Sequence, residues 1–518
     1  MRVDLDLAAK APLAMPPPLH VASLSARSIA PWLALAVLFA VAIIERLVLP
    51  ANTDISWLLT IGERYLDGAR LYADIIEVNP PIAVLVYLPA IVIAHGLGLA
   101  PEAVVDVLVF AAILAALAIV AQILRNTDVL GGLADGRRAA LGVVVFAILA
   151  NLPAQTFGQR EHIALLAFLP AIAVFLVRAR GEAPSAWAVV VAGLGAGVML
   201  AFKPYFAIPC GAAAVTVAML SRSWRPLFAV ENLIALVVVG LYALFVVMVF
   251  PDYVATIVPL VRDVYLKVQL PWPQLLTNVA ISLLVATMLA AGMLKRRTTL
   301  DPNFLVLSAI AAGFAAAFLL QRKGWPYQSY PMLAVALMAL ADALATSSLR
   351  TVADRVWAVV AFALLGLGFV AGMIWLDLGR DMRVLEVSVG RIATRPKILV
   401  LSGEPSFGYP LVRAVHGTSV SRQQAFWVRN YIAWLKARGP IDPDDEARLT
   451  GYAARERAML IEDFRRQPPD AVLIETEVSI WNQWIAEDSD IAELMKPYEA
   501  VANVDGVSIL RRKREPST

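Results

Sequence analysis

Cysteine is nearly absent from this sequence, and charged residues are scarce. Cys210 is the one cysteine among 518 residues, so disulfide bonds within the chain and cysteine-based metal sites are excluded. Asp, Glu, Lys and Arg make up 16% of the chain, against 60% hydrophobic residues. This balance excludes a soluble protein of ordinary composition and predicts an α-helical polytopic membrane protein. The formal charge of +3 is small for this length and indicates no nucleic-acid partner.

Long apolar runs are missing from the first 28 residues. This segment combines Pro16-Pro17-Pro18 with scattered charge and shows no periodicity. A cleaved signal peptide would place a short apolar core near the start, whereas here the first apolar run begins at about Ile29 and has full length. We therefore expect residues 1–28 to form a flexible tail that stays attached on the cytosolic side.

Twelve segments are apolar over about the length that crosses a bilayer, which is roughly 20 residues. They are 29–50, 80–97, 101–124, 139–157, 161–178, 185–203, 205–220, 228–250, 274–294, 303–320, 329–346 and 354–376. Segment 80–97 is short and contains Pro89, His95 and Gly96, so we expect eleven spans and one partial segment. Together they form a predicted transmembrane domain over residues 29–377.

Basic residues cluster in alternate connections between these segments. The clusters are Arg125, Arg137 and Arg138; Arg178 and Arg180; Arg222 and Arg225; Lys295, Arg296 and Arg297; and Arg350 and Arg355. Lys and Arg concentrate in cytoplasmic loops, so these connections predict the cytoplasmic face of an inner membrane. The periplasmic face then carries the loop 51–80, the loop 251–273 and the chain after residue 377.

Residues 378–518 have the composition of a soluble domain. Its expected elements are strands at 397–402 and 471–475, helices at 421–437 and 444–467, and a terminal hairpin over 499–512. The sequence therefore predicts a small α/β domain in the periplasm. Its Gly403 and Gly408 form no dinucleotide fingerprint, which argues against a Rossmann cofactor site.

The loop 51–80 concentrates polar residues that hydrocarbon would reject. From Ile55 to Leu66 the apolar residues share one face, which predicts a helix lying in the membrane interface. Trp57 and Tyr65 would then lie at headgroup depth. At the end of the loop, Asn79-Pro80-Pro81-Ile82 predicts an extended entry into the next apolar segment, because the residue before proline avoids helical geometry.

The order of these features resembles the C-type glycosyltransferase superfamily, in particular the branch with the bacterial lipid A aminoarabinose transferases and the protein O-mannosyltransferases. The resemblance lies in Asp54 just after the first span, Pro80-Pro81-Ile82 after the first outer loop, Glu161 in the next outer loop, and an outer C-terminal domain. It covers roughly the first 200 residues by motif and the remainder by architecture. The chain has Glu161 where many relatives have Asp.

This resemblance implies an inverting enzyme that moves a sugar from a polyprenyl-phosphate donor to a hydroxyl of a lipid, glycan or protein acceptor at the outer face. It implies Asp54 as the general base, and Glu161 as a catalytic residue that positions the acceptor or holds a divalent cation; no other cofactor is implied. The departing lipid phosphate needs positive charge or hydrogen-bond donors. The candidate substrate-binding residues on the predicted outer face are Glu77, Asn79, Arg160, His162, Lys203, Tyr205, Arg262, Lys267, Arg322, Lys323 and Tyr327.

Plainer interpretations exist beside these. Asp54 also suits the cap of a surface helix, Lys203 a snorkelling helix end, and Arg322-Lys323 an interfacial anchor. The aromatic segment 421–427 is either a sugar platform or a helix with its aromatics packed inward. For the whole chain, the alternatives are a transporter or flippase of a lipid-linked or polar substrate, or a partner protein without catalysis. The lack of an obvious internal repeat and the outer domain favour the transferase.

Overall fold

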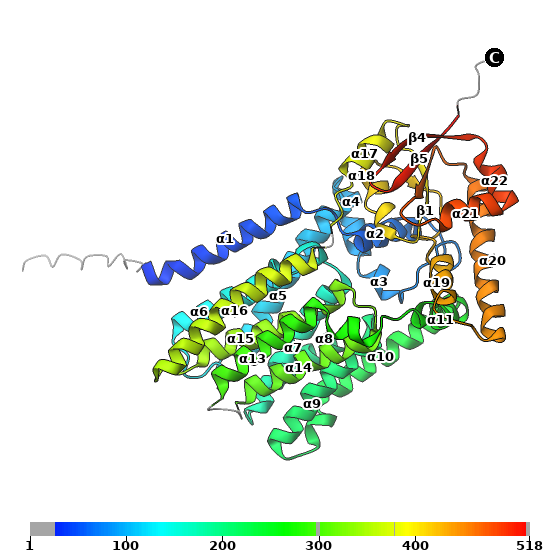
Figure 1. Ribbon diagram of the computed structural model, residues 1–518. Coiled ribbons are helices and arrows are strands. Elements are labelled where there is room, and N and C mark those ends of the chain that lie inside the picture. Colours follow the sequence, from blue (N-terminus) through cyan, green and yellow to red (C-terminus); the bar gives the residue numbers. More distant parts are fainter. Residues whose placement is uncertain (1–25, 297–300, 378, 514–518) are drawn as a thin grey trace, which may run out of the picture.

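The computed structural model describes residues 26–296, 301–377 and 379–513. Most of the predicted tail 1–28 lies outside these ranges, as do Arg297 and the predicted domain boundary at residue 378. Figure 1 shows a bundle of long helices with a smaller domain, containing all five strands, packed on one end. The helix α1 (Ala26–Val48) lies along the edge of the bundle and packs on α6 (Asp135–Ala150).

Each of the twelve predicted apolar segments contains a helix, and within the described ranges eight helical segments are long and apolar enough to cross a membrane. These eight contain α1 (Ala26–Val48), α5 (Pro101–Leu124), α7 (Arg160–Ala179), α9 (Ala207–Ser221), α10 (Val230–Val249), α14 (Pro302–Gln321), α15 (Pro326–Thr346) and α16 (Val352–Leu376). Shorter helices are α3 (Ile82–Leu85), α4 (Leu88–Leu97), α6 (Asp135–Ala150), α8 (Ala186–Phe202) and α13 (Val279–Lys295). The fold prediction of about eleven or twelve apolar segments is confirmed.

One predicted span ends earlier than expected. The segment 139–157 is helical only to Ala150, the end of α6, and then turns through Pro153 into the short 3-10 helix Ala154–Thr156. Proline has no backbone N–H to continue a helix, which accounts for the break. Residues 151–159 therefore do not complete a membrane span. The segment 80–97 is also broken, into α3 and α4, and both helices are too short to span.

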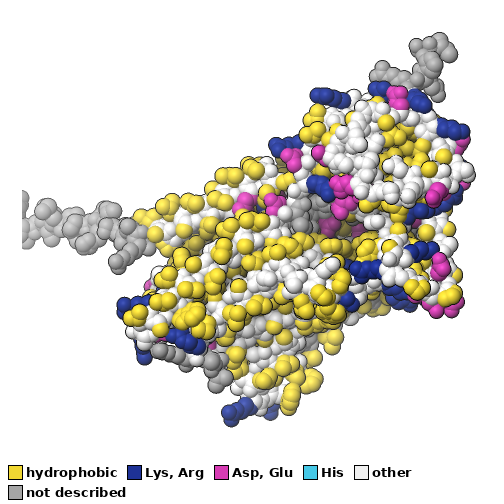
Figure 2. All heavy atoms as spheres, in the orientation of Figure 1, with side chains coloured by type: hydrophobic (Ala, Val, Ile, Leu, Met, Phe, Trp, Pro, Cys, Tyr) yellow, Lys and Arg dark blue, Asp and Glu magenta, His cyan; other side chains and the backbone are white. Residues whose placement is uncertain are grey.

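Burial separates the helices into a centre and a periphery. Within the most apolar stretch of each helix, 78% of the residues of α7 and 83% of those of α15 are buried inside the protein. The corresponding share is 6% in α1 and 11% in α10. The peripheral helices present apolar side chains outward, and Figure 2 shows hydrophobic side chains covering much of the bundle surface. Gly193 and Gly197 of α8 let α10 approach closely, because a Cβ there would lie 2.6 Å from Ile234 and 2.5 Å from Val238.

The C-terminal domain contains a five-stranded sheet of order β2-β1-β3-β5-β4. The strands are β1 (Lys397–Leu401), β2 (Thr418–Ser419), β3 (Ala471–Glu475), β4 (Tyr498–Val504) and β5 (Val507–Arg512). β1 is parallel to β2 and β3, whereas β5 runs antiparallel to β3 and β4. The helices are α17 (Arg383–Gly390), α18 (Leu411–Ala414), α19 (Trp427–Lys436), α20 (Pro443–Arg466), α21 (Ile480–Glu487) and α22 (Ser489–Met495). Both predicted strands and the hairpin are confirmed.

The predicted helix 421–437 is wrong over its first six residues, because α19 begins only at Trp427. The preceding residues 421–426 are not helical, and Gln423 forms a parallel bridge with Ile76 of the loop that follows α2 (Thr53–Leu66). The amide of Ile76 donates to the carbonyl of Arg422 at 2.8 Å. Pairing between two segments far apart in sequence therefore overrides the local helical spacing.

Helix α2 is held between the bundle and the C-terminal domain. Arg413 of α18 donates two hydrogen bonds to the Glu63 carboxylate, at 2.7 and 3.0 Å, and also bonds Glu102 at the start of α5. Contrary to the expectation for an interfacial helix, Trp57 does not face the lipid headgroups: its side chain is 2% exposed and packs edge-on against Tyr409 of the C-terminal domain at 5.2 Å. The apolar face expected to meet lipid instead meets protein.

Candidate active site

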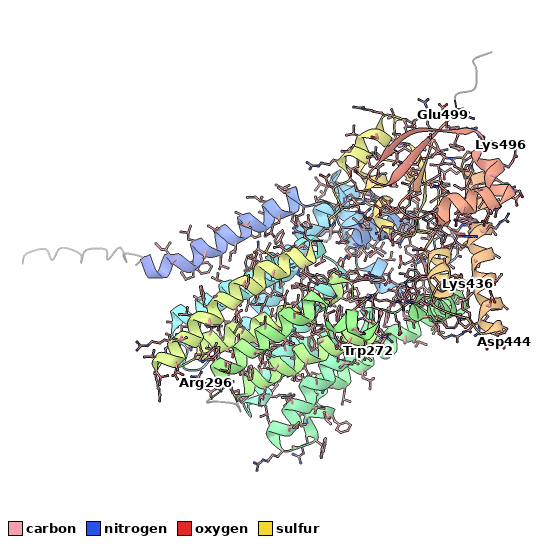
Figure 3. The ribbon with its side chains drawn as sticks, in the orientation of Figure 1. Trp272, Arg296, Lys436, Asp444, Lys496 and Glu499 are labelled. Carbon is pink, nitrogen blue, oxygen red and sulfur yellow. The ribbon has the colours of Figure 1, made fainter. Side chains whose placement is uncertain are left out.

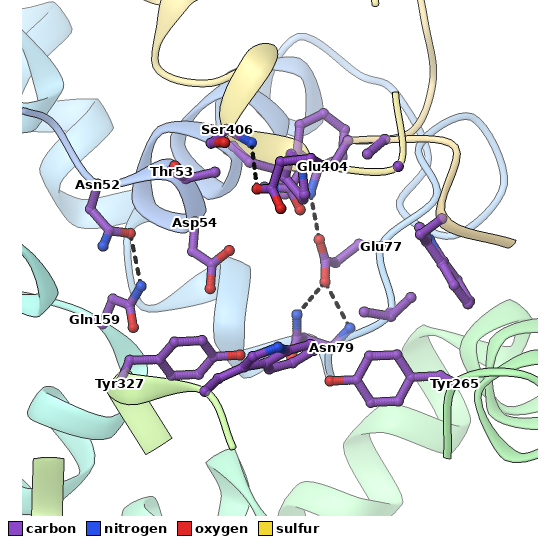
Figure 4. A pocket seen from close by; sticks show the side chains of 18 of the residues that line it. Asn52, Thr53, Asp54, Glu77, Asn79, Gln159, Tyr265, Tyr327, Glu404 and Ser406 are labelled. Carbon is purple, nitrogen blue, oxygen red and sulfur yellow. Dashed lines mark hydrogen bonds between the residues drawn. The ribbon is translucent and has the colours of Figure 1, made fainter. Parts of the chain in front are cut away.

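A cavity of about 540 Å³ lies between the bundle and the C-terminal domain, and Figure 4 shows its polar lining. Its lining residues fall in 52–57, 76–79, 155–160, 265, 325–327, 380, 403–406 and 424–431. The first five groups belong to the bundle and its loops, and the last three to the chain after α16. The cavity therefore has one wall from each part of the protein, and the fold brings together segments that are about 350 residues apart in sequence.

Asp54 and Arg160 form an ion pair in this cavity. Asp54 stands in the first turn of α2, Arg160 is the first residue of α7, and Nη2 of Arg160 donates to Oδ2 of Asp54 at 2.9 Å. Arg160 is only 5% exposed, and its Nε and Nη1 have no hydrogen-bond acceptor in the described parts of the chain. The guanidinium thus holds the carboxylate with one nitrogen, and its other two nitrogens are buried without an acceptor among the described residues.

Asn52 and Gln159 fix this pair by joining the residues just before the two helices. Oδ1 of Asn52 accepts hydrogen bonds from the amide of Ile55, at 3.1 Å, and from Nε2 of Gln159, at 2.9 Å. Nδ2 of Asn52 donates to the carbonyl of Gln155 at 3.0 Å. Asn52 is therefore the side chain that caps α2, a role the sequence also allowed for Asp54. Asp54 remains free to face the cavity.

Glu77 is a buried carboxylate on the same side of the cavity. It accepts hydrogen bonds from Nε1 of Trp57 at 2.5 Å, and from the amide and side-chain nitrogens of Asn79 at 2.8 and 2.5 Å. Burial raises the pKa of Glu77, and Arg160 and the hydrogen bonds from Asn79 and Trp57 oppose that rise. Tyr72 donates to the carbonyl of Asn79 at 2.7 Å. Glu77 and Asn79 therefore order the loop that precedes α3.

Glu161 and Lys203 lie behind this layer and pair with each other. Glu161 is 1% exposed, and neither residue lines the cavity. Nζ of Lys203 also donates to Gln321 at 3.2 Å and lies 5.5 Å from the centre of the Tyr327 ring. Burial lowers the pKa of Lys203, while Glu161 opposes that shift. Because an ammonium group occupies the position a cation would take, and the described residues contain no cluster of three His, Cys, Asp or Glu ligands, this donor set does not fit the divalent cation considered at Glu161.

Six other predicted binding residues do not line the cavity. Arg262 pairs with Asp263, Lys267 with Asp445, and Arg322 bonds Leu270 and Gln269 and stacks on Trp272. His162 is buried and accepts from the amide of Gly158 through Nδ1, while Tyr205 is half-buried at the start of the chain leading into α9. Lys323 donates to the carbonyls of Tyr265 and Val268, so it holds one of the lining residues. The sequence could not distinguish these residues from Arg160, because all of them are polar and lie on the predicted outer face.

Aromatic side chains line the side of the cavity opposite α2. Tyr265 contacts the rings of Trp325 and Trp427, with centroids 5.9 and 6.1 Å apart, and Tyr431 lies 5.6 Å from Trp427. Tyr327, one of the predicted binding residues, lies 5.8 Å from Trp325. The sugar platform considered at 421–427 thus contributes Trp427 to the cavity, whereas Phe426 packs inward against Trp481.

Several lining residues carried no sequence signal. Gln155, Tyr265 and Asn430 are single polar or aromatic residues in ordinary surroundings, and only the fold brings them to the cavity. Asn52 did have a detectable signal, since an asparagine two residues before an acidic first turn is a common helix cap. Glu404 follows strand β1, where a turn was expected, and it enters the cavity through the contact between the two parts of the protein.

The start of α19, which carries Trp427, is held by Glu456 of α20. The Glu456 carboxylate is 1% exposed and accepts from the amides of Val428, at 3.2 Å, and Arg429, at 2.8 Å. Burial raises the pKa of Glu456 from 4.5 to about 7, against the effect of these hydrogen bonds. Between these two values the folded state binds a proton that the unfolded state releases, so stability falls as pH rises through this window.

We therefore expect Glu456→Gln to remove this pH dependence. The quantity compared is the free energy of unfolding of the original protein minus that of the variant. This difference should fall by about 3 kcal/mol between pH 4 and pH 8. Thermal or urea unfolding of both proteins in detergent across this range measures the difference. A difference that stays constant with pH would show that Glu456 titrates at the same pH in the folded and unfolded states.

No protein-family model matches the chain, and no curated protein sequence matches it. Solved structures are similar over nearly the whole chain, and two of them are structures of ArnT. The crystal structure of ArnT from Cupriavidus metallidurans in the apo state has a TM-score of 0.57 and 14% identity, covering 93% of this chain and 98% of that one. The crystal structure of the same protein bound to undecaprenyl phosphate has a TM-score of 0.56 and 13% identity, covering 92% and 97%. This likeness confirms the predicted fold, which is that of the two ArnT structures, and the eight membrane-length apolar segments among the described residues make the chain an integral, multi-pass membrane protein.

Proposed function

We propose that this protein transfers a sugar from a polyprenyl-phosphate donor to an acceptor hydroxyl inside the cavity. The observation that carries the proposal is the pair formed by Asp54 and Arg160. It places a carboxylate and a buried guanidinium with two unused donors on one wall of the cavity. The fold supports the choice of donor, because one of the similar ArnT structures is bound to undecaprenyl phosphate.

In the proposed reaction, the acceptor hydroxyl gives its proton to Asp54 and its oxygen bonds to the anomeric carbon of the sugar. The bond between that carbon and the phosphate oxygen breaks on the opposite face, and the lipid phosphate leaves with the electron pair. The anomeric configuration is therefore inverted. Nε and Nη1 of Arg160 donate to the phosphate oxygens, where negative charge increases in the transition state.

The contact between Asp54 and Arg160 explains how one site serves both steps. One guanidinium contacts the proposed base and, in the proposed reaction, the departing phosphate, so it holds these two groups on one wall of the cavity. Glu161 and Lys203 act as positioning residues, because they neutralise each other beneath Arg160 and Tyr327.

We propose that the cavity opens on the periplasmic side of the inner membrane. Arg296, from one of the basic clusters, lies at the end of the bundle far from the C-terminal domain (Figure 3). Since basic clusters favour the cytoplasmic side, the cavity and the C-terminal domain belong to the other side. A lipid, a glycan or a protein supplies the acceptor hydroxyl there.

The test is a transfer assay with the purified full-length protein in detergent. Radiolabelled sugars on a synthetic polyprenyl phosphate are mixed with membrane extract as a source of acceptors, and the same sugars on nucleotides serve as the control. We expect label to move from at least one lipid donor and from no nucleotide donor. If no lipid donor in a broad panel is used, or if nucleotide donors work equally well, the proposed function is wrong.

A further inference from the structure

The C-terminal domain builds one wall of the cavity from two short segments. The turn 403–406 follows β1, and residues 424–431 lead into and form the start of α19. The two segments are packed tightly: a Cβ on Gly403 would lie 2.5 Å from Nδ2 of Asn430. Only glycine at this position lets the Asn430 amide pack directly against the turn, so the two segments form one continuous surface.

This wall has polar groups that the protein itself leaves available. Glu404 accepts a hydrogen bond from the amide of Ser406 at 3.2 Å through Oε1, and its carboxylate points toward the cavity in Figure 4. Nε2 of Gln424 is buried and has no acceptor among the described residues. With the amide of Asn430, these side chains offer both donors and acceptors. An alternating set of donors and acceptors suits the hydroxyl groups of a sugar.

Aromatic rings complete the wall. Trp427 and Tyr431 stand beside these polar groups, and Tyr265 faces them from the bundle at about 6.1 Å from each ring. Flat rings beside a few fixed polar groups are the usual composition of a pocket that orients a small ligand. The C–H face of a sugar ring packs on such rings while its hydroxyls reach the polar groups.

The charges near the cavity are predominantly negative. Asp54, Glu77 and Glu404 supply three carboxylates to the lining, against the guanidinium groups of Arg160 and Arg380. Arg160 is engaged by Asp54, and Arg380 lies 4.6 Å over the Phe407 ring with a nitrogen 3.8 Å from Glu477. Arg380 is thus the one cation that the C-terminal part contributes to the described lining, and it is directed toward Phe407 and Glu477, while Glu404 points toward the cavity.

We infer that this wall binds the donor's sugar ring and that Glu404 selects against negative charge. The wall accepts a sugar that is uncharged or carries an amine, and it rejects a sugar that carries a carboxylate, because the second carboxylate would meet Glu404. This inference rests on the proposed function, since it names the class of sugar transferred. Glu404 is a specificity-determining residue, whereas Asp54 and Arg160 carry out the transfer.

The experiment compares two donors that differ only in charge: a polyprenyl phosphate carrying a hexose and one carrying the corresponding hexuronic acid. The proteins are the original chain, Glu404→Gln, and Glu499→Gln as a matched control. Glu499 lies at the outer edge of the same domain, away from the cavity, and pairs with Arg511 (Figure 3). Glutamine at 404 keeps the oxygen that accepts from Ser406 and removes only the charge.

We expect the original protein and Glu499→Gln to favour the hexose donor by about tenfold or more in kcat/KM. Glu404→Gln should narrow that preference by about tenfold, mainly by accepting the uronic acid better. If the original protein uses both donors equally, or if Glu404→Gln leaves the ratio unchanged while transfer occurs, the inference is overturned and the proposed function stands.

A second measurement separates the inference from the proposed function. The thermal stability of the three proteins in detergent is compared with a methyl hexoside and with the matching methyl hexuronide. If only the hexoside stabilises the original protein, and both glycosides stabilise Glu404→Gln, the result supports sugar binding by this wall. This conclusion holds even if no lipid donor is used. If neither glycoside stabilises the original protein and no donor is transferred, both the wall and the proposed function are wrong.

Discussion

Replacing Asp54 with asparagine is expected to slow sugar transfer by a factor of about 10²–10⁴, the usual contribution of a general base. Asparagine has nearly the same shape and can still accept from Nη2 of Arg160, so the cavity should keep its geometry. It cannot take the proton from the acceptor hydroxyl. The loss should therefore appear in kcat, with little change in the KM for the lipid donor.

Asp74→Asn is the matched control for this variant. Asp74 lies on the loop after α2 and forms an exposed ion pair with Arg70 away from the cavity lining. Exposed pairs of this kind contribute little to stability, so transfer should stay within about twofold of the original. If Asp54→Asn unfolds at the same temperature as the original protein and transfers sugar as fast, Asp54 is not the base.

Replacing Arg160 with lysine is expected to reduce kcat/KM by a factor of about 10²–10³, as when a donor to a developing charge is lost. Lysine keeps the positive charge but lacks the planar fork that holds Asp54 with one nitrogen and leaves two donors for phosphate. The substitution should therefore change the orientation of Asp54 and weaken the binding of the leaving lipid phosphate. We therefore expect kcat to fall and the KM for the donor to rise.

Arg322→Lys distinguishes Arg160 from the other basic residues suggested by the sequence. Arg322 bonds the carbonyl of Leu270 and the side chain of Gln269, and it does not line the cavity. Its replacement should change kcat/KM by no more than about threefold, within the range of an indirect effect. An equal loss in Arg160→Lys and Arg322→Lys would show that Arg160 has no special role at the phosphate.

The parts of the fold that could be predicted are those whose signal is local. Apolar length located α7 and α14, and a compact apolar run followed by turn residues located β1. The turn Asp505-Gly506 located the hairpin of β4 and β5, and the position of Asp54 after the first span identified one wall of the cavity. Each of these depends on residues that are close together in the sequence, so the pattern and its cause lie in the same window.

The parts that could not be predicted depend on distant contacts. Trp57 is a residue type that is common at membrane interfaces, but the C-terminal domain covers it. Residues 421–426 have helical spacing, but Gln423 among them forms a bridge with Ile76. Glu161 shares its polarity with Asp54, and it directly follows Arg160 in the sequence, yet Arg160 enters the cavity while Glu161 faces Lys203. Successive residues of a helix point about 100° apart, and which of them faces a cavity is decided by packing.

Residues 403–431 supply one wall of the cavity, so the complete cavity can form only after these residues have been synthesised. A ribosome makes the chain from its N-terminus, so every helix of the bundle is synthesised before this wall emerges. Until Arg413 reaches Glu63 and Glu102, Asp54 and Arg160 stand open to water on one side. A nascent or truncated chain would thus lack one wall of the cavity, and the proposed transfer could begin only after synthesis of the C-terminal domain.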